Sequence, residues 1–149
     1  RPEHALLPDD ALVYCSFGDA SANHSTAQGA FNAAGWTAWQ SIPLPLLFVC
    51  EDNGIGISTK TPKGWIEANF SSRPGLRYFK ADGLDFYDAF KVAQEAADFV
   101  RRRKKPAVLH IRTIRLYGHA GADVPTTYLP REEVEARVHA AINVLNVQG

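Results

Sequence analysis

Residues 11–21 read ALVYCSFGDAS, an apolar run that stops at a glycine and an aspartate. A second run of the same kind, at 46–54, reads LLFVCEDNG. Each run has the length and the β-branched and aromatic content of a buried strand. The interval between Asp19 and Asn53 leaves room for one crossover helix, so both polar ends would reach the carboxyl edge of one parallel sheet. Open α/β folds bind their ligands at that edge.

The polar residues at these two strand ends have the chemistry of a cation and phosphate site. The Asp19 carboxylate and the Asn53 amide oxygen are hard donors, which suit Mg²⁺ or Ca²⁺ rather than zinc. Gly18 lets the backbone approach an anion, and a following helix would direct its N–H groups toward that anion. Taken singly, each polar cluster is also an ordinary turn sequence. Together, at neighbouring strand ends, they predict a cradle for metal-bridged phosphate.

Outward from these two strands, the chain alternates helix and strand patterns. The expected helices are 24–40, 65–70, 84–103 and 131–145, and the expected further strands are 76–81 and 107–113. This alternation predicts the α/β class, as a three-layer α/β/α fold with a mostly parallel sheet.

Apolar stripes along two helices predict faces that pack on the core. The stripes are Phe86, Ala89, Phe90, Ala93, Ala97 and Val100 in one helix, and Val134, Val138, Ala141, Ile142 and Leu145 in the other. The last helix is expected to close the domain. Trp36, Trp39 and Trp65 are expected to be core or interface anchors, and the basic run 101–105 a solvated helix end.

The composition argues against several classes of protein. The 149 residues, 46% of them hydrophobic, are enough for one globular domain over 1–149. Sixteen acidic and sixteen basic residues leave a formal charge of zero, so no nucleic-acid partner is expected. Apolar runs are too short to span a bilayer, so no membrane partner is expected. Cys15 and Cys50 lie in strand patterns, which predicts buried, reduced thiols and a cytoplasmic location.

The beginning of the sequence predicts a piece of a longer chain. The sequence contains no methionine and opens at Arg1 without the features of a signal peptide. We therefore expect a domain that is incomplete on its N-terminal side.

The two polar clusters belong to a longer pattern. The segment 17–59, with FGDA, FNAA and LPLLFVCEDNGIGIST in order, resembles the thiamine-diphosphate motif of thiamine-dependent 2-oxoacid dehydrogenases. The similarity is to the alpha subunit of the decarboxylating component. It continues through 75–77, 81–85, 114–120 and 131–134, and so covers nearly the whole chain.

The resemblance implies a set of site residues and a thiamine-diphosphate-binding fold. Asp19, the Asn53 side chain and the Ile55 backbone carbonyl would ligate Mg²⁺. The diphosphate of thiamine diphosphate would be held by Gly18, by the backbone N–H groups of Ala20 and Ser21, and by Arg115. His119 would lie near the cofactor on a mobile loop, as the catalytic residue that handles protons.

The resemblance also implies an activity and partners. A 2-oxoacid would be oxidatively decarboxylated, and its acyl group transferred to a lipoyl-bearing acyltransferase. A beta subunit or a fused domain would bind the aminopyrimidine, within an oligomer, and this fragment alone would be inactive. Three alternatives remain: another thiamine enzyme such as an acetoin dehydrogenase or a transketolase-like protein, a catalytically silent assembly domain, and a Rossmann-type dinucleotide binder. A Rossmann-type binder would need a glycine fingerprint after the first strand. The Gly54-Ile55-Gly56 segment resembles that fingerprint only weakly and lies elsewhere in the chain.

Three positions depart from the family pattern. Ala20 stands where glycine is usual, which is tolerated only if its φ is negative. Asp52 stands where asparagine is usual and adds negative charge beside the cation. Ala120 stands where mitochondrial members carry a regulatory serine, so no phosphorylation is expected at that position.

Overall fold

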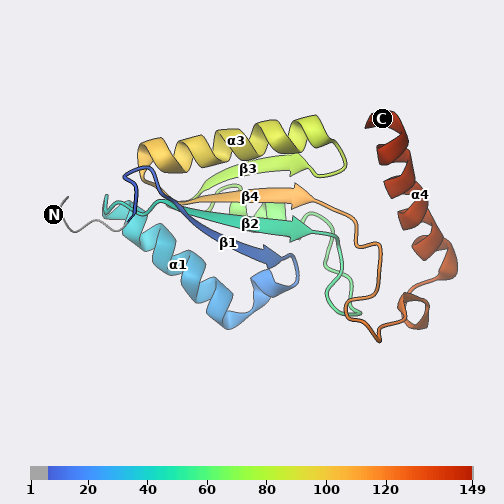
Figure 1. The fold of residues 1–149 in the computed structure, drawn as a ribbon. Coiled ribbons are helices and arrows are strands. Elements are labelled where there is room, and N and C mark those ends of the chain that lie inside the picture. The colour runs from blue at the N-terminus through green and yellow to red at the C-terminus, as the bar shows by residue number, and fades with distance from the viewer. Residues whose placement is uncertain (1–6, 149) are drawn as a thin grey trace.

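The structure is a computed structural model that describes residues 7–148 and, in the last helix, side chains as far as Val144. Its elements, in chain order, are β1 (Val13–Gly18), η2 (Ser21–Asn23), α1 (Ser25–Trp39), β2 (Leu46–Asp52), α2 (Trp65–Phe70), β3 (Arg77–Asp82), α3 (Phe86–Arg103), β4 (Ala107–Arg112), η3 (Pro125–Thr127) and α4 (Arg131–Gln148) (Figure 1). Every helix and strand expected from the sequence is present, with bounds shifted by a few residues.

One sheet of four parallel strands positions the polar edge. Its order is β1-β2-β4-β3, and each neighbouring pair is parallel. Gly18 lies opposite Glu51, and Asp52 lies opposite Arg112. Because all the strands run the same way, their carboxyl ends meet along one edge, as expected.

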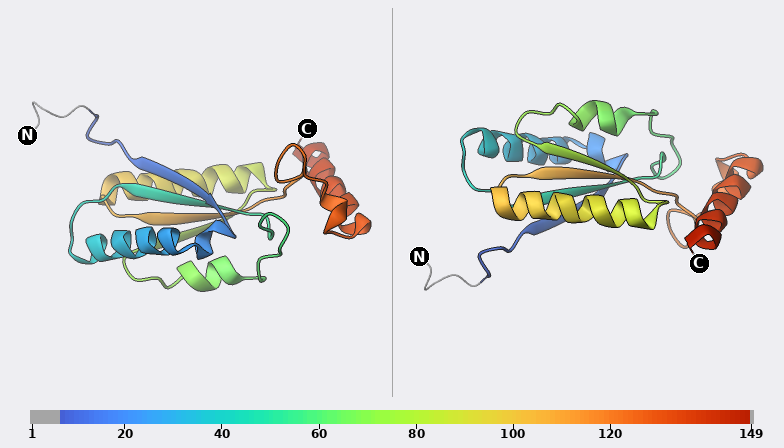
Figure 2. Two further views of the ribbon diagram at one scale, coloured as in Figure 1. Left: turned by 90° about the horizontal axis from the view of Figure 1, so that it is seen from below. Right: turned by 90° about the horizontal axis from the view of Figure 1, so that it is seen from above.

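Helices cover both faces of this sheet, which confirms the three-layer fold. Side chains alternate along a strand, so Phe48 and Cys50 of β2 pack on one face while Leu47 and Val49 pack on the other. Helices α1 and α2 lie over the first face, and α3 lies over the second (Figure 2). Asp85 begins α3 by accepting hydrogen bonds from the backbone N–H groups of Tyr87 and Asp88, at 2.9 and 3.1 Å.

Strand β1 departs from the expectation of a buried strand. It is the edge strand of the sheet, and Val13 is 61% exposed, with Tyr14 and Cys15 also exposed. The predicted burial of Cys15 is therefore wrong within the described residues. Composition could not reveal this, because whether a strand is central or at the edge depends on the order of the strands.

The expected apolar stripes are only partly buried. In α3 the packed face is centred on Ala96 and Val100, whereas Phe86 and Phe90 at its first turns are exposed. Trp36 and Trp39 on α1 are 69% and 76% exposed, and Trp65 is also exposed, so none of the three is a core anchor in the described chain.

Helix α4 does not close the domain over the sheet. It stands at the carboxyl edge, apart from the three layers (Figure 1), and Val138 and Ile142 of its expected face are exposed. Leu145, the last residue of that face, lies outside the described side chains. Within residues 7–148, no helix combines the length and apolar character needed to cross a bilayer.

The other cysteine, Cys50, is buried as expected. It has no exposed surface, and burial raises the pKa of its thiol, with Asp52, Asp19 and Glu51 adding to the rise. Since the thiolate is the reactive form, we expect Cys50 to resist alkylation by N-ethylmaleimide in the native protein and to react in denaturant. Mass spectrometry of a Cys15→Ser variant, which lacks the exposed thiol, measures this directly; rapid native labelling at Cys50 would contradict it.

Candidate functional site

Asp19, the first residue after β1, is buried with an unsatisfied carboxylate. It is 1% exposed, and its Oδ2 has no hydrogen-bond partner among the described residues. Burial raises its pKa and the Asp52 carboxylate adds to the rise, while the Thr61 side chain and the backbone N–H of Asn53 oppose it as hydrogen-bond donors. An unpartnered buried carboxylate oxygen destabilises the fold, and a bound cation would satisfy it. Asp19 therefore has the surroundings of a metal ligand.

The turn after β2 holds Asn53 close to Asp19. Asp52 Oδ1 accepts a hydrogen bond from the Gly54 N–H at 3.0 Å, and Asn53 Oδ1 accepts one from the Ile55 N–H at 3.1 Å. Asp and Asn favour turns of this kind because their short side chains reach the backbone two residues ahead. Gly54 supplies the positive φ of 75° that the turn needs.

The segment after β1 is unstrained and lies against the loop that follows Asn53. Ala20 has a φ of −68°, so the replacement of glycine at this position introduces no strain. A Cβ placed on Gly56 would lie 3.0 Å from the Cβ of Ala20, so a glycine at 56 allows the loop to approach the 18–21 segment closely. Ser21 begins the short helix η2, and Ile55 is 2% exposed. The structure thus brings the two polar strand ends together.

Arg115 follows β4 and binds the loop around Gly56 through hydrogen bonds to its backbone carbonyls. Its Nη1 donates to the Gly56 carbonyl at 2.6 Å, and its Nη2 donates to the Ile57 carbonyl at 3.1 Å and to the Tyr128 hydroxyl at 2.9 Å. Its Nε is buried and has no partner among the described residues. The guanidinium therefore binds protein oxygens through Nη1 and Nη2, and Nε is its one nitrogen without a partner among the described residues.

His119 lies on the exposed loop before η3, and Asp123 ties that loop down. The backbone N–H of His119 donates to Asp123 Oδ2 at 2.5 Å, and the Tyr128 hydroxyl donates to the same oxygen at 2.6 Å. The Tyr128 hydrogen bond is the main cause that lowers the pKa of Asp123, and the His119 N–H adds to it. His119 and Arg115 are thus linked through two residues, Asp123 and Tyr128, that the sequence analysis missed because they belong to no local motif.

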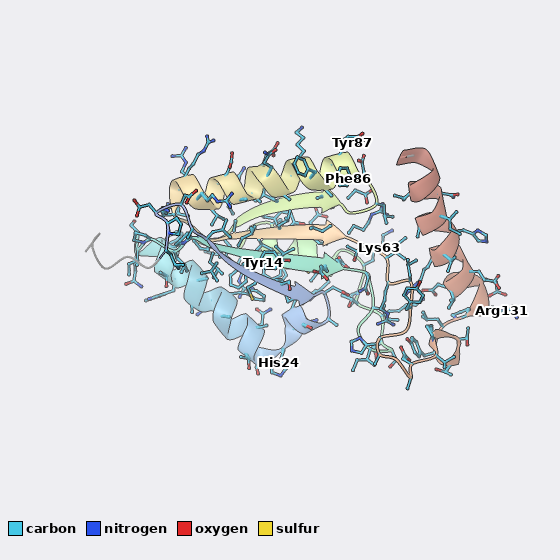
Figure 3. The ribbon with its side chains drawn as sticks, in the orientation of Figure 1. Tyr14, His24, Lys63, Phe86, Tyr87 and Arg131 are labelled. Atoms are coloured by element: carbon cyan, nitrogen blue, oxygen red, sulfur yellow. The ribbon has the colours of Figure 1, made fainter. Side chains whose placement is uncertain are left out.

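A cleft of 620 Å³ opens at the same edge, between the sheet and α4. Asn53 and Asp52 line it together with His110, and Lys63 lies beside the carboxyl ends of the strands (Figure 3). Asp19 does not line this cleft. Most of the basic side chains around the cleft form salt bridges. Lys60 pairs with Glu133 and Lys80 pairs with Glu67, each with an N···O distance of 2.6 Å.

The expected cation site is not a cluster of acidic side chains. Across residues 7–148, no group of three or more histidine, cysteine or acidic side chains is placed to hold a metal ion. The expected set instead combines one carboxylate, Asp19, with the amide oxygen of Asn53 and the carbonyl of Ile55. All three are oxygen donors, which fits a hard cation that shares its coordination with a phosphate.

The sheet order and its polar edge define an α/β domain of the class that binds ligands at the carboxyl ends of parallel strands. Residues 6–145 match the family described as Dehydrogenase E1 component, and the chain belongs to that family. The resemblance stated from the sequence is thereby confirmed.

Three relatives illustrate the match. The chain is 35% identical over 134 residues to pyruvate dehydrogenase E1 component subunit alpha of Zymomonas mobilis, covering 88% of this chain and 36% of that relative. It is 31% identical to the testis-specific mitochondrial form of that subunit from Homo sapiens, covering 85% of this chain and 32% of the relative. It is 30% identical to the mitochondrial alpha subunit of the pyruvate dehydrogenase E1 component from Saccharomyces cerevisiae, and the match covers 89% of this chain and 30% of that relative. The chain therefore spans about a third of the length of these curated relatives.

Proposed function

We propose that this chain is the Mg²⁺- and diphosphate-binding domain of a thiamine-dependent 2-oxoacid dehydrogenase. The observation that carries the proposal is the buried Asp19 carboxylate, whose Oδ2 has no partner in the part of the chain that the structure describes and whose neighbour across the strand ends is the Asn53 turn. Membership of the Dehydrogenase E1 component family supports it. When bound, thiamine diphosphate supplies an electron sink for decarboxylation of a 2-oxoacid.

The residues of this chain have separate tasks in that proposal. Asp19, Asn53 and the Ile55 carbonyl hold the cation, and the backbone of Gly18, Ala20 and Ser21 faces the diphosphate. Arg115 fixes the loop around Gly56 with its two terminal nitrogens and offers Nε to a phosphate oxygen. The exposed His119 exchanges protons with the reacting substrate or the acyl acceptor, from a loop anchored at Asp123.

Substrate and partners follow from the relatives as further parts of the proposal. Because three relatives are named pyruvate dehydrogenase subunits, pyruvate is the first substrate to assay, with 2-oxoisovalerate and acetoin alongside. A beta subunit or fused domain would bind the aminopyrimidine, and a lipoyl-bearing protein would take the acyl group. This chain by itself would then be inactive.

Calorimetric titration of the complete protein with thiamine diphosphate tests the proposal. With Mg²⁺ present, we expect a binding signal in the wild type that Asp19→Ala abolishes, because that variant loses the only carboxylate of the proposed cation site. Asp98→Ala, which removes an equal charge from α3, is the control and should bind normally. Equal binding by wild type and Asp19→Ala would remove the proposal.

A further inference from the structure

Three polar side chains form a hydrogen-bonded chain beside the proposed cation site. His110 Nε2 lies 2.8 Å from Asp52 Oδ2, and His110 Nδ1 lies 2.7 Å from the Tyr78 hydroxyl. The three residues come from β2, β4 and β3, and His110 is only 5% exposed. His110 lies in the strand expected over 107–113, and none of the sequence motifs includes it. A buried histidine with both ring nitrogens engaged is held in one orientation.

The direction of these hydrogen bonds follows from elementary chemistry. A carboxylate oxygen accepts hydrogen bonds, so His110 Nε2 carries the hydrogen that faces Asp52. The remaining nitrogen, Nδ1, then accepts from the Tyr78 O–H. Burial raises the pKa of Tyr78, with Glu67 adding to the rise, so this hydroxyl keeps its proton to donate. The chain therefore runs from Tyr78 to His110 to Asp52 and fixes which imidazole nitrogen faces each partner.

Both oxygens of Asp52 are engaged by this arrangement. Oδ2 accepts from His110, and Oδ1 accepts from the Gly54 N–H within the turn that carries Asn53. Asp52 is a second carboxylate near Asp19. Without these hydrogen bonds its side chain would be free to rotate and to compete with Asp19 for the cation, or for the hydrogen bonds that Thr61 and Asn53 donate to Asp19. Held as it is, Asp52 stabilises the turn instead.

We propose that His110 and Tyr78 are positioning residues of the cation site, and that they act through Asp52. His110 orients the Asp52 carboxylate onto the Gly54 N–H, which fixes the turn that presents Asn53, and Tyr78 fixes the tautomer of His110. This inference rests on the proposed function, since it concerns the same cation. Partners that orient the surroundings of metal ligands typically change metal affinity by about 10- to 100-fold when removed.

Titration of the complete protein with Mn²⁺, in the presence of thiamine diphosphate and followed by electron paramagnetic resonance, tests it. Manganese suits the same oxygen donors as magnesium and reports its own binding without any assay of activity. His110→Leu should weaken Mn²⁺ binding about tenfold. His110→Gln, whose side-chain amide can still donate to Asp52, should stay within about threefold of the wild type.

The decisive comparison repeats His110→Leu in the Asp52→Ala background, which removes the side-chain hydrogen bonds to His110 and to the Gly54 N–H. If His110 acts through the Asp52 carboxylate, its loss there should change Mn²⁺ affinity less than about twofold. An equal loss in both backgrounds would show that His110 merely fills space, and would overturn the inference. So would a His110→Gln variant as weak as His110→Leu.

Two further variants keep the test decisive. Tyr78→Phe keeps the ring and removes only the hydroxyl, so it serves if His110→Leu does not fold. We expect it to weaken Mn²⁺ binding about threefold with Asp52 present and not in the Asp52→Ala background; unchanged binding in both would count against the inference. Asp19→Ala separates the two proposals: if it binds Mn²⁺ as the wild type does, the proposed function itself fails, whereas if it alone loses binding, only the role of His110 and Tyr78 fails.

Discussion

Asp19→Asn is expected to make the cofactor-free protein more stable while it weakens metal-dependent cofactor binding. The Asp19 carboxylate is buried, its Oδ2 lacks a partner among the residues that the structure describes, and Asp52 lies close enough to raise its pKa. Asparagine keeps the size and removes the charge, so the free energy of unfolding should rise by about 1 kcal/mol or more, because an unsatisfied buried group costs more when it is charged than when it is neutral. Scanning calorimetry without cofactor measures the gain.

The rise in the free energy of unfolding caused by Asp19→Asn should also depend on pH in a defined direction. A raised pKa in the folded state means that the folded protein binds a proton more readily than the unfolded chain. The contribution of Asp19 to stability is therefore greatest below its ordinary pKa of 3.8 and is lost as the pH rises through the folded-state pKa. The advantage of Asp19→Asn should accordingly be largest at neutral pH and shrink toward pH 4.

A carboxylate at the same sheet edge provides the control for this prediction. Asp82 is paired with Arg112 at 2.6 Å, and the Arg112 hydrogen bond lowers its pKa. Asp82→Asn should therefore leave stability unchanged or reduce it. If both substitutions shift the melting temperature in the same direction, the unpartnered oxygen of Asp19 is not the cause.

The sequence was enough to predict that the two polar strand ends share one edge of the sheet, because the relevant signals are local. One strand pattern stops at Gly18-Asp19 and another stops at Asp52-Asn53, so each strand has a polar end. Parallel pairing then places both ends on one edge of the sheet. The negative φ of Ala20 agrees with the tolerance expected for that substitution. Each of these conclusions depends on neighbouring residues and on one rule of topology.

The supporting residues could not be predicted, because they meet only through the register of the sheet. His110 and Asp52 are 58 positions apart, and Tyr78 and His110 are 32 apart. Their contact requires β4 to lie between β2 and β3, an order that no local pattern specifies. The exposure of β1 and of α4 escaped prediction for the same reason: an apolar residue is buried only where another element covers it.

Among the substitutions predicted to change stability, Gly75→Ala is expected to lower the free energy of unfolding most. Gly75 has a φ of +78°, and a Cβ there would lie 2.3 Å from the Gly35 carbonyl oxygen and 2.8 Å from the Gly35 Cα in α1. The positive φ alone costs about 1–2 kcal/mol for an L-residue. The collision with the α1 backbone adds the usual overpacking penalty, so we expect a loss of about 3 kcal/mol or more in the free energy of unfolding.

Two other glycines separate the causes of that loss. Gly64 has a φ of +79°, and no described residue beyond its chain neighbours lies within 4 Å of its added Cβ, so Gly64→Ala should show the backbone penalty of about 1–2 kcal/mol alone. Gly29 lies inside α1, also with nothing within 4 Å, and Gly29→Ala should stabilise the protein by about 0.5–1 kcal/mol because alanine favours helix. Denaturant unfolding of the three variants measures the series. Equal losses at Gly75 and Gly64 would mean that α1 and the 74–75 turn can move apart freely, and that close backbone packing does not hold α1 in place over the sheet.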